Sequence, residues 1–143
     1  MTPQVLVLSQ DYSRTRHFIQ CLQELRLGAR AAASLSEVQR LCTIAGTVLL
    51  LDADFFDSPT REVFDVSSAL SVPVIVIVSR FDTPKWINLI KRGASEVLRD
   101  PVSAQDLQSS IFRVLPQLQW KLAGKSTGWL ERTLRAGRAL LGK

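Results

Sequence analysis

The stretch TVLLLDAD, residues 47–54, contains four consecutive aliphatic residues that lead directly into Asp52. A short apolar run of this kind is typical of a strand that is buried on both faces of a parallel sheet. A carboxylate at the end of such a strand lies at the carboxyl edge of the sheet, where open α/β folds place their functional groups. Asp52 is therefore the first candidate for a functional residue.

Further strand-like segments occur on both sides of this stretch. In chain order, the predicted strands are QVLVLS at 4–9, a weaker ARAAA at 29–33, TVLLLD at 47–52, PVIVIVS at 73–79 and SEVLR at 95–99. A segment with apolar residues at helical spacing follows each strand. Because crossovers between parallel strands are right-handed, this order predicts an α/β, flavodoxin-like fold, a five-stranded parallel sheet with helices on both faces.

Polar residues that can cap helices mark where the predicted helices begin. The third helix, predicted over 59–70, has the weakest helical propensity because it contains valines and paired serines. Proline in a first turn and a Ser or Thr cap are typical helix starts. The predicted caps are Asp11 or Ser13, Ser34 with Glu37, Thr83 followed by Pro84 at the first helical position, and Ser103 with Asp106.

The net charge of +5 lies entirely at the C-terminal end of the chain. Residues 1–115 contain as many basic as acidic residues, whereas residues 116–143 contain six lysines and arginines against Glu131 alone. We therefore predict a neutral domain at 1–115, followed by a basic tail at 116–143. A chain of 143 residues fits one such domain with an extension.

The composition indicates a cytoplasmic protein. No apolar run approaches the length of a membrane span, and the N-terminus lacks the basic segment and cleavage site of a signal peptide. Cys21 and Cys42 match no metal spacing, and we expect buried free thiols rather than a disulfide. The single histidine, His17, lies beside Arg14 and Arg16, and we expect all three on a solvated helix face rather than in a catalytic site.

Over residues 3–115 the chain resembles a response-regulator receiver domain. The resemblance lies in the segments VLVLSQDYS, TVLLLDAD, PVIVIVSR and, most persuasively, GASEVLRDPVSAQDLQSSI. It implies that Asp52 occupies the phospho-acceptor position of a two-component system. It also implies an acidic pair at the end of the first strand, a hydroxyl after the fourth, and an aromatic residue and a lysine on and after the fifth.

This sequence departs from the pattern at each of those other positions. The acidic pair falls on Ser9 and Gln10, the hydroxyl on Val78, the aromatic residue on Val97 and the lysine on Asp100. Phosphoryl transfer to a carboxylate needs a divalent cation held by acids and a cation on the phosphoryl oxygens. These substitutions remove both, and Asp100 near Asp52 would add like-charge repulsion.

The sequence therefore predicts a pseudo-receiver that is not an enzyme and has no metal, cofactor or small-molecule substrate. Asp52 is then a vestige, or an acceptor of hydrogen bonds from loop amides. We interpret the chain as a phosphorylation-independent signalling adaptor that acts by protein–protein interaction. The alternatives are a genuine phospho-acceptor that uses Asp52 with Asp11 or Asp54, and the N-terminal input domain of a longer ATPase or DNA-binding regulator.

Two segments are candidates for contact with a protein partner, either a second copy in a homodimer or another signalling protein. The fourth helix, KWINLIKR, has apolar residues on more than one face, and we assign Trp86, Leu89 and Ile90 to an interaction surface. A tryptophan that covers only the edge of the core is the alternative. In receivers, this helix belongs to the face used for dimerisation and effector contact.

The tail is predicted to be an amphipathic basic helix. Its arginines recur every third residue opposite an apolar stripe. The stripe can pack on the domain or on a second copy, while binding to a membrane surface or to nucleic acid is the less favoured alternative. The residues of the stripe assigned to interaction are Trp129, Leu130, Leu134 and Leu141.

Overall fold

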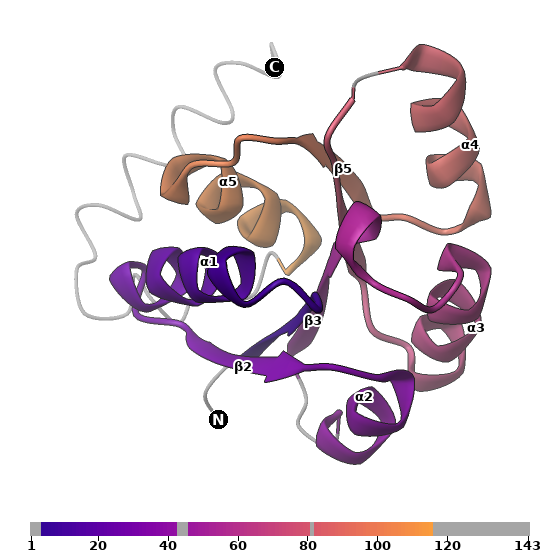
Figure 1. Cartoon of the computed structure of the whole chain (residues 1–143). Helices are drawn as coiled ribbons and strands as arrows, with labels where there is room; N and C mark the ends of the chain where they lie inside the picture. The colour runs from indigo at the N-terminus through magenta and orange to yellow at the C-terminus, as the bar shows by residue number, and fades with distance from the viewer. Residues whose placement is uncertain (1–3, 43–45, 81, 116–143) are drawn as a thin grey trace, which may run out of the picture.

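The computed structural model describes residues 4–42, 46–80 and 82–115, which form a five-stranded α/β unit (Figure 1). The tail and its predicted helix lie outside the described residues. The elements are β1 (Gln4–Leu8), α1 (Tyr12–Glu24), β2 (Gly28–Ala32), α2 (Leu35–Leu41), β3 (Thr47–Asp52), the 3₁₀ turn η1 (Ala53–Phe55), α3 (Thr60–Leu70), β4 (Val74–Val78), α4 (Thr83–Arg92), β5 (Glu96–Arg99) and α5 (Ala104–Val114).

All strand pairs are parallel, and the strand order is β2-β1-β3-β4-β5. Helices α1 and α5 cover one face of the sheet, and α2, α3 and α4 cover the other (Figure 1). This architecture confirms the predicted flavodoxin-like fold. Since every strand ends at the same edge, the loops after β1, β3, β4 and β5 meet around the end of β3.

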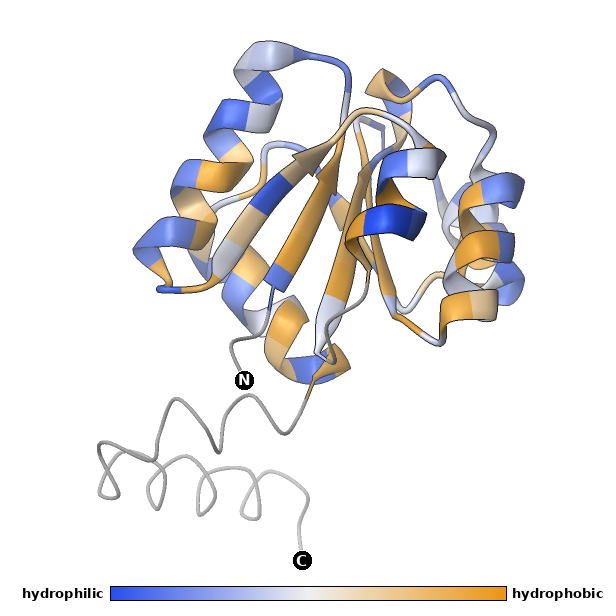
Figure 2. Ribbon diagram, turned by 90° about the horizontal axis from the view of Figure 1, so that it is seen from below, coloured by the Kyte–Doolittle hydropathy of each residue, from blue (hydrophilic) through white to orange (hydrophobic). Residues whose placement is uncertain are grey.

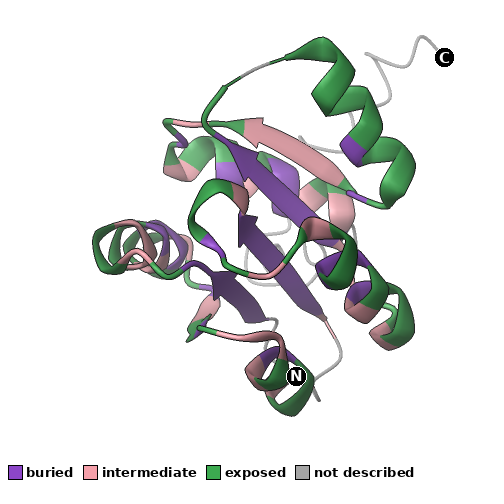
Figure 3. Cartoon of the chain, turned by 45° about the vertical axis from the view of Figure 1, so that its right-hand side comes forward, coloured by how far each residue is buried: buried purple, intermediate pink, exposed green. Residues whose placement is uncertain are grey.

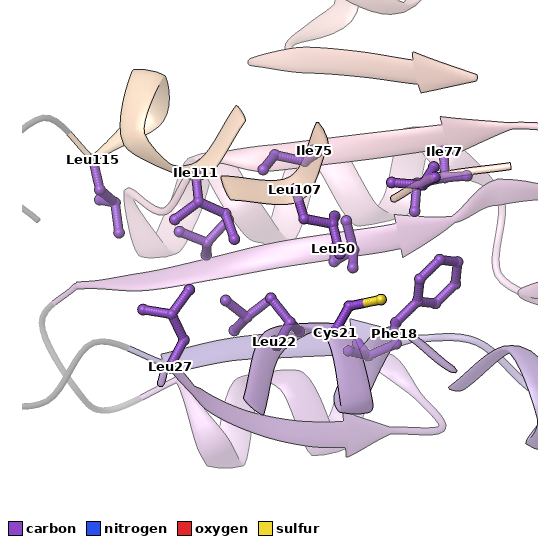
Figure 4. Packing of buried hydrophobic residues seen from close by; sticks show 14 residues of the cluster. Phe18, Cys21, Leu22, Leu27, Leu50, Ile75, Ile77, Leu107, Ile111 and Leu115 are labelled. Carbon is purple, nitrogen blue, oxygen red and sulfur yellow. The ribbon is translucent and has the colours of Figure 1, made fainter. Parts of the chain in front are cut away.

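The core consists of two apolar layers, one on each face of the sheet. Every residue of β1, β3 and β4 is buried (Figure 3), as expected of strands in the interior of a parallel sheet. The strands of the sheet are largely hydrophobic (Figure 2). Figure 4 shows the layer under α1 and α5, in which Phe18 and Leu22 meet Leu107 and Ile111 across Leu50. Burial of large side chains of this kind, at about 1.5–3 kcal/mol each, stabilises the sheet that positions the site.

Most of the predicted helix starts are confirmed. Asp11 caps α1 by accepting a hydrogen bond from the backbone N–H of Arg14, and Ser34 accepts one from Glu37 at the start of α2. Ser103 and Asp106 form a reciprocal capping box. The predicted cap of α4, Thr83, is wrong by one residue, because Asp82 is the cap. The side chain of Asp82 makes no capping hydrogen bond.

Both cysteines are free thiols, as predicted. Cys21 is buried, whereas Cys42 is half-buried rather than buried. Burial raises the pKa of each thiol above its ordinary value, so neither is activated as a nucleophile. In the part of the chain that the structure describes, no helix has the length and apolar character needed to cross a membrane.

Candidate functional site

Asp52 ends β3 at the carboxyl edge of the sheet, and its side chain is only 1% exposed. The hydroxyl of Ser9, at the end of β1, donates a hydrogen bond of 2.9 Å to Oδ2 of Asp52. The two strands are direct neighbours, so parallel pairing places their ends side by side. Ser9 therefore takes part in the site as a neutral donor, where an acid would be needed to hold a cation.

Arg14 supplies the charge that balances Asp52. Its Nε donates to Oδ2 of Asp52 at 2.7 Å and its Nη2 donates to Oδ1 at 2.8 Å, so both carboxylate oxygens are engaged in a bidentate pair. The same guanidinium donates to both carboxylate oxygens of Asp100 at 3.2 Å. Arg14 thus bridges two acids from the ends of β3 and β5, and the predicted repulsion between those acids is offset by the cation between them.

The position of Arg14 follows from the start of α1. Asp11 caps the helix, and this places Arg14 in the first turn with its side chain over the end of the sheet. Its guanidinium carbon lies 4.4 Å from the ring centroid of Phe55 and 5.5 Å from that of Phe18. Such cation–π contacts stabilise a partly desolvated guanidinium.

Arg14 remains charged at every relevant pH. Its hydrogen bond with Asp52 is the main cause that raises the pKa of Arg14 above the ordinary value, with burial opposing it and Asp100 adding to it. The side chain of Arg14 is 21% exposed, against 1% for Asp52. The pair is therefore asymmetric, since the carboxylate depends on its partner much more than the guanidinium does.

The other acids near this edge are engaged elsewhere. The carboxylate of Asp11 caps α1, and Oδ2 of Asp54 accepts hydrogen bonds from both the backbone N–H, at 2.9 Å, and the hydroxyl of Ser79. Among the described residues, no three His, Cys, Asp or Glu side chains are placed to hold a metal ion. The residues at this edge do not fit the divalent cation of an active receiver, because Asp52 is already paired with an internal cation.

Gln10 connects three loops at the same edge. Its Nε2 donates to the carbonyl of Ala33 at 2.9 Å, and its Oε1 accepts from the N–H of Asp57 at 2.8 Å. Its own backbone N–H donates to the carbonyl of Phe55 at 2.7 Å. The side-chain amide of Gln10 therefore cross-links the loops after β1, β2 and β3. A carboxylate at this position could accept a hydrogen bond from Asp57 but could not donate one to Ala33.

Three other positions that the resemblance aligns with the receiver pattern, Val78, Val97 and Asp100, are apolar or acidic. Val78 is buried, and Val97 is half-buried against the same apolar layer. Neither side chain can report on a phosphoryl group by a hydrogen bond. Asp100 precedes Pro101 across a cis peptide bond and is half-buried beside Arg14.

The structure changes the membership of the predicted interaction surface on α4. Trp86, Ile87 and Ile90 are 39%, 40% and 38% exposed, respectively. Leu89 is 6% exposed and packs into the core, so assigning it to this surface is wrong. The helix turns Leu89 towards the sheet, and the other three residues form the exposed apolar surface of α4.

Arg14 is the residue of the candidate site that the sequence pattern did not reveal. The prediction of a solvated helix face holds for the exposed Arg16 and His17, but it is wrong for Arg14. Two sequence features together could have identified Arg14, namely the helix cap at Asp11 and the acid at position 100. The cap fixes Arg14 at the edge of the sheet, where two carboxylates need a cation.

The contact between Asp54 and Ser79 predicts a pH dependence of stability. The hydrogen bond from the Ser79 hydroxyl is the main cause that lowers the pKa of Asp54 below its ordinary value of 3.8, and burial opposes it. A lowered pKa in the folded state stabilises the fold above about pH 4, and this stabilisation is lost as the pH falls through the folded pKa. We expect Ser79→Ala to flatten the decline in urea stability below about pH 4. Ser95→Ala is the exposed control, and equal pH profiles for the two variants would rule out this contribution.

Comparison with protein-family profiles and with curated proteins gives no match. Solved structures do match the chain. A response regulator receiver domain protein from Clostridium thermocellum is 21% identical with a TM-score of 0.71, over 82% of this chain and 98% of its own. The beryllofluoride-activated NtrC4 receiver domain dimer is 25% identical with a TM-score of 0.70, over 80% and 97%. The receiver domain of the Francisella response regulator 1452 is 19% identical with a TM-score of 0.70, over 82% and 99%. The chain therefore has the fold of response-regulator receiver domains.

Proposed function

We propose that this chain, with the fold of a receiver domain, is a signalling adaptor that works without phosphorylation. The observation that carries the proposal is the bidentate pairing of Arg14 with Asp52, the residue at the phospho-acceptor position. A carboxylate whose two oxygens both accept hydrogen bonds from a guanidinium is a poor nucleophile, since its charge is already neutralised. The neutral Ser9 and Gln10 and the acidic Asp100 remove the groups that would hold a metal ion and a phosphoryl group.

The second part of the proposal is that the loops at the carboxyl edge of the sheet hold one conformation without phosphorylation. The contacts between these loops support it. In a receiver, the loop after the fourth strand responds to the phosphorylated carboxylate. Here that loop is joined to the loop after β3 by the bonds between Ser79 and Asp54. We infer that the protein holds one arrangement of these loops and of the α4 surface that follows them.

A titration with magnesium and beryllofluoride, followed through amide chemical shifts, tests the proposal. We expect no saturable shift at the amide of Asp52 or its neighbours at millimolar magnesium. We also expect no stable phosphoryl label from a small-molecule donor. Saturable shifts at this edge, or a label that Asp52→Asn abolishes, would instead favour the genuine phospho-acceptor.

The exposed apolar surface of α4 is the proposed site of contact with a protein partner, and a second copy of the chain is the first candidate. The NtrC4 receiver domain was solved as a dimer, which supports self-association of this fold. Trp86, Ile87 and Ile90 are the large apolar side chains that α4 exposes, whereas its Leu89 is buried. Exposed apolar groups of this kind mark interaction sites.

We expect Trp86→Ala combined with Ile90→Ala to lower the concentration-dependent mass of the full chain in light scattering. The two side chains would be buried in the interface, and truncation of aromatic anchors commonly weakens association by at least about 2 kcal/mol. Tyr12→Ala removes an exposed aromatic ring from α1 instead and should leave the mass unchanged. If the mass does not respond to the α4 substitutions, the association does not use this surface.

A further inference from the structure

A pocket of about 430 Å³ is lined by residues of α3 and α4. These two helices lie on the face of the sheet away from α1 and α5 (Figure 1). The lining residues are Arg61, Phe64, Asp65 and Arg92. Arg61 lies in the first turn of α3 and Arg92 is the last residue of α4. The pocket therefore brings together cations from two separate helices, and its volume is in the range of small-molecule sites.

The charges in this pocket are unbalanced. Within the described residues, ion pairs form between Arg14 and its two acids and between Arg113 and Glu96, but none involves Arg61 or Arg92. Asp65 is the one acid among these lining residues, and the ion pairs of the described residues include none between it and either arginine. Arg61, Asp65 and Arg92 are all exposed. Two arginines that line one open pocket favour an anion there, because each can donate two parallel hydrogen bonds to a carboxylate or phosphate.

Helix α4 packs on the rest of the fold through a single buried residue. Of its residues, Leu89 is buried and all others are exposed (Figure 3). An anion held by both Arg61 and Arg92 would connect the C-terminal end of α4 to α3. Binding in this pocket would therefore restrict the motion of the helix that carries Trp86, Ile87 and Ile90.

We propose that the pocket binds a small organic anion, a phosphate ester or a carboxylate, and that binding orders α4. Arg61 and Arg92 bind the anionic group, and the carboxylate of Asp65 accepts a hydrogen bond from a hydroxyl or amine of the same molecule. The ordering of α4 regulates the interaction surface and in that respect rests on the proposed function. The binding itself does not, because the pocket shares no residue with the Asp52 site.

Titrations of the full chain with glucose 6-phosphate, with citrate and with glucose test the proposal through the amide shifts of Phe64 and Gly93. We expect saturable shifts with one or both anions at concentrations up to about 10 mM, and none with glucose. The response to the phosphate ester or to citrate identifies the source of the anion. The α4 amides should also exchange more slowly with solvent when the anion is bound.

Three variants separate this site from a general attraction of anions to a basic protein. Arg61→Gln and Arg92→Gln should each weaken binding by about tenfold or more, because each removes charge-assisted hydrogen bonds. Lys91→Gln removes the same charge from the same last turn of α4, outside the pocket, and should leave the affinity within about twofold. An absence of saturation with both anions, or an equal loss in Lys91→Gln and Arg92→Gln, would overturn the proposal. Either of these two outcomes would overturn the anion site alone, because the magnesium titration at Asp52 tests the proposed function separately.

Discussion

Replacing Arg14 by methionine is expected to lower the free energy of unfolding at neutral pH by about 3–5 kcal/mol, because a buried carboxylate then loses its partner. Asp52 is 1% exposed and would keep only the hydrogen bond from Ser9. Chemical denaturation at neutral pH measures this loss.

The asymmetry of the pair provides the controls for this prediction. Asp52→Asn should cost less than Arg14→Met, since Arg14 is partly exposed and keeps its bonds to Asp100. Arg14→Met combined with Asp52→Leu should recover much of the lost stability, because two apolar side chains can replace a buried ion pair. Arg16→Met, on the exposed face of the same helix, should change stability by less than about 0.5 kcal/mol. Equal losses in Arg14→Met and Arg16→Met would contradict the proposed importance of the pair.

Four substitutions that give the chain the acids and the lysine of the receiver pattern are expected to create a magnesium site. The substitutions are Ser9→Asp, Gln10→Asp, Arg14→Ser and Asp100→Lys. They supply one carboxylate at position 9, which contacts Asp52, and a second at the next residue. They also release both oxygens of Asp52 from the guanidinium and place a lysine at position 100. We expect the dissociation constant for magnesium to move from beyond measurement to the millimolar range, since a hard cation needs several oxygen ligands.

The variant that keeps Arg14 but carries the other three substitutions is the informative control. Its magnesium affinity should stay at least about tenfold weaker, because the internal cation still competes for Asp52. Adding Asp52→Asn to the fourfold variant should remove the new site. If the fourfold variant folds, as its amide spectrum would show, and still binds no magnesium, then Ser9 and Gln10 do not occupy the metal-binding positions.

The fold could be predicted from the sequence because its determinants are local. The apolar run that ends at Asp52 and the caps at Asp11, Ser34 and Ser103 each depend on a few neighbouring residues. The outward face of α4 was harder, because helical periodicity does not say which of several apolar residues contacts the sheet. Leu89 is the one that does.

The site itself could be predicted only in part. The sequence placed Asp52 and the neutral residues at Ser9 and Gln10, since each lies at the end of a strand. It did not place Arg14, whose carboxylate partners are 38 and 86 residues away along the chain. A long charged side chain at the start of a helix can point to solvent or over the sheet, and only packing decides between them.

The pairing of Arg14 with Asp52 has a consequence for how a signal is timed. In a phosphorylated receiver, the lifetime of the signal is set by the competing rates at which the mark is added and removed. Here the balancing charge is part of the polypeptide and is present from the moment the chain folds. Under the proposed function, output would then be set by how much protein the cell makes and how fast it degrades it, so the response would follow synthesis and turnover.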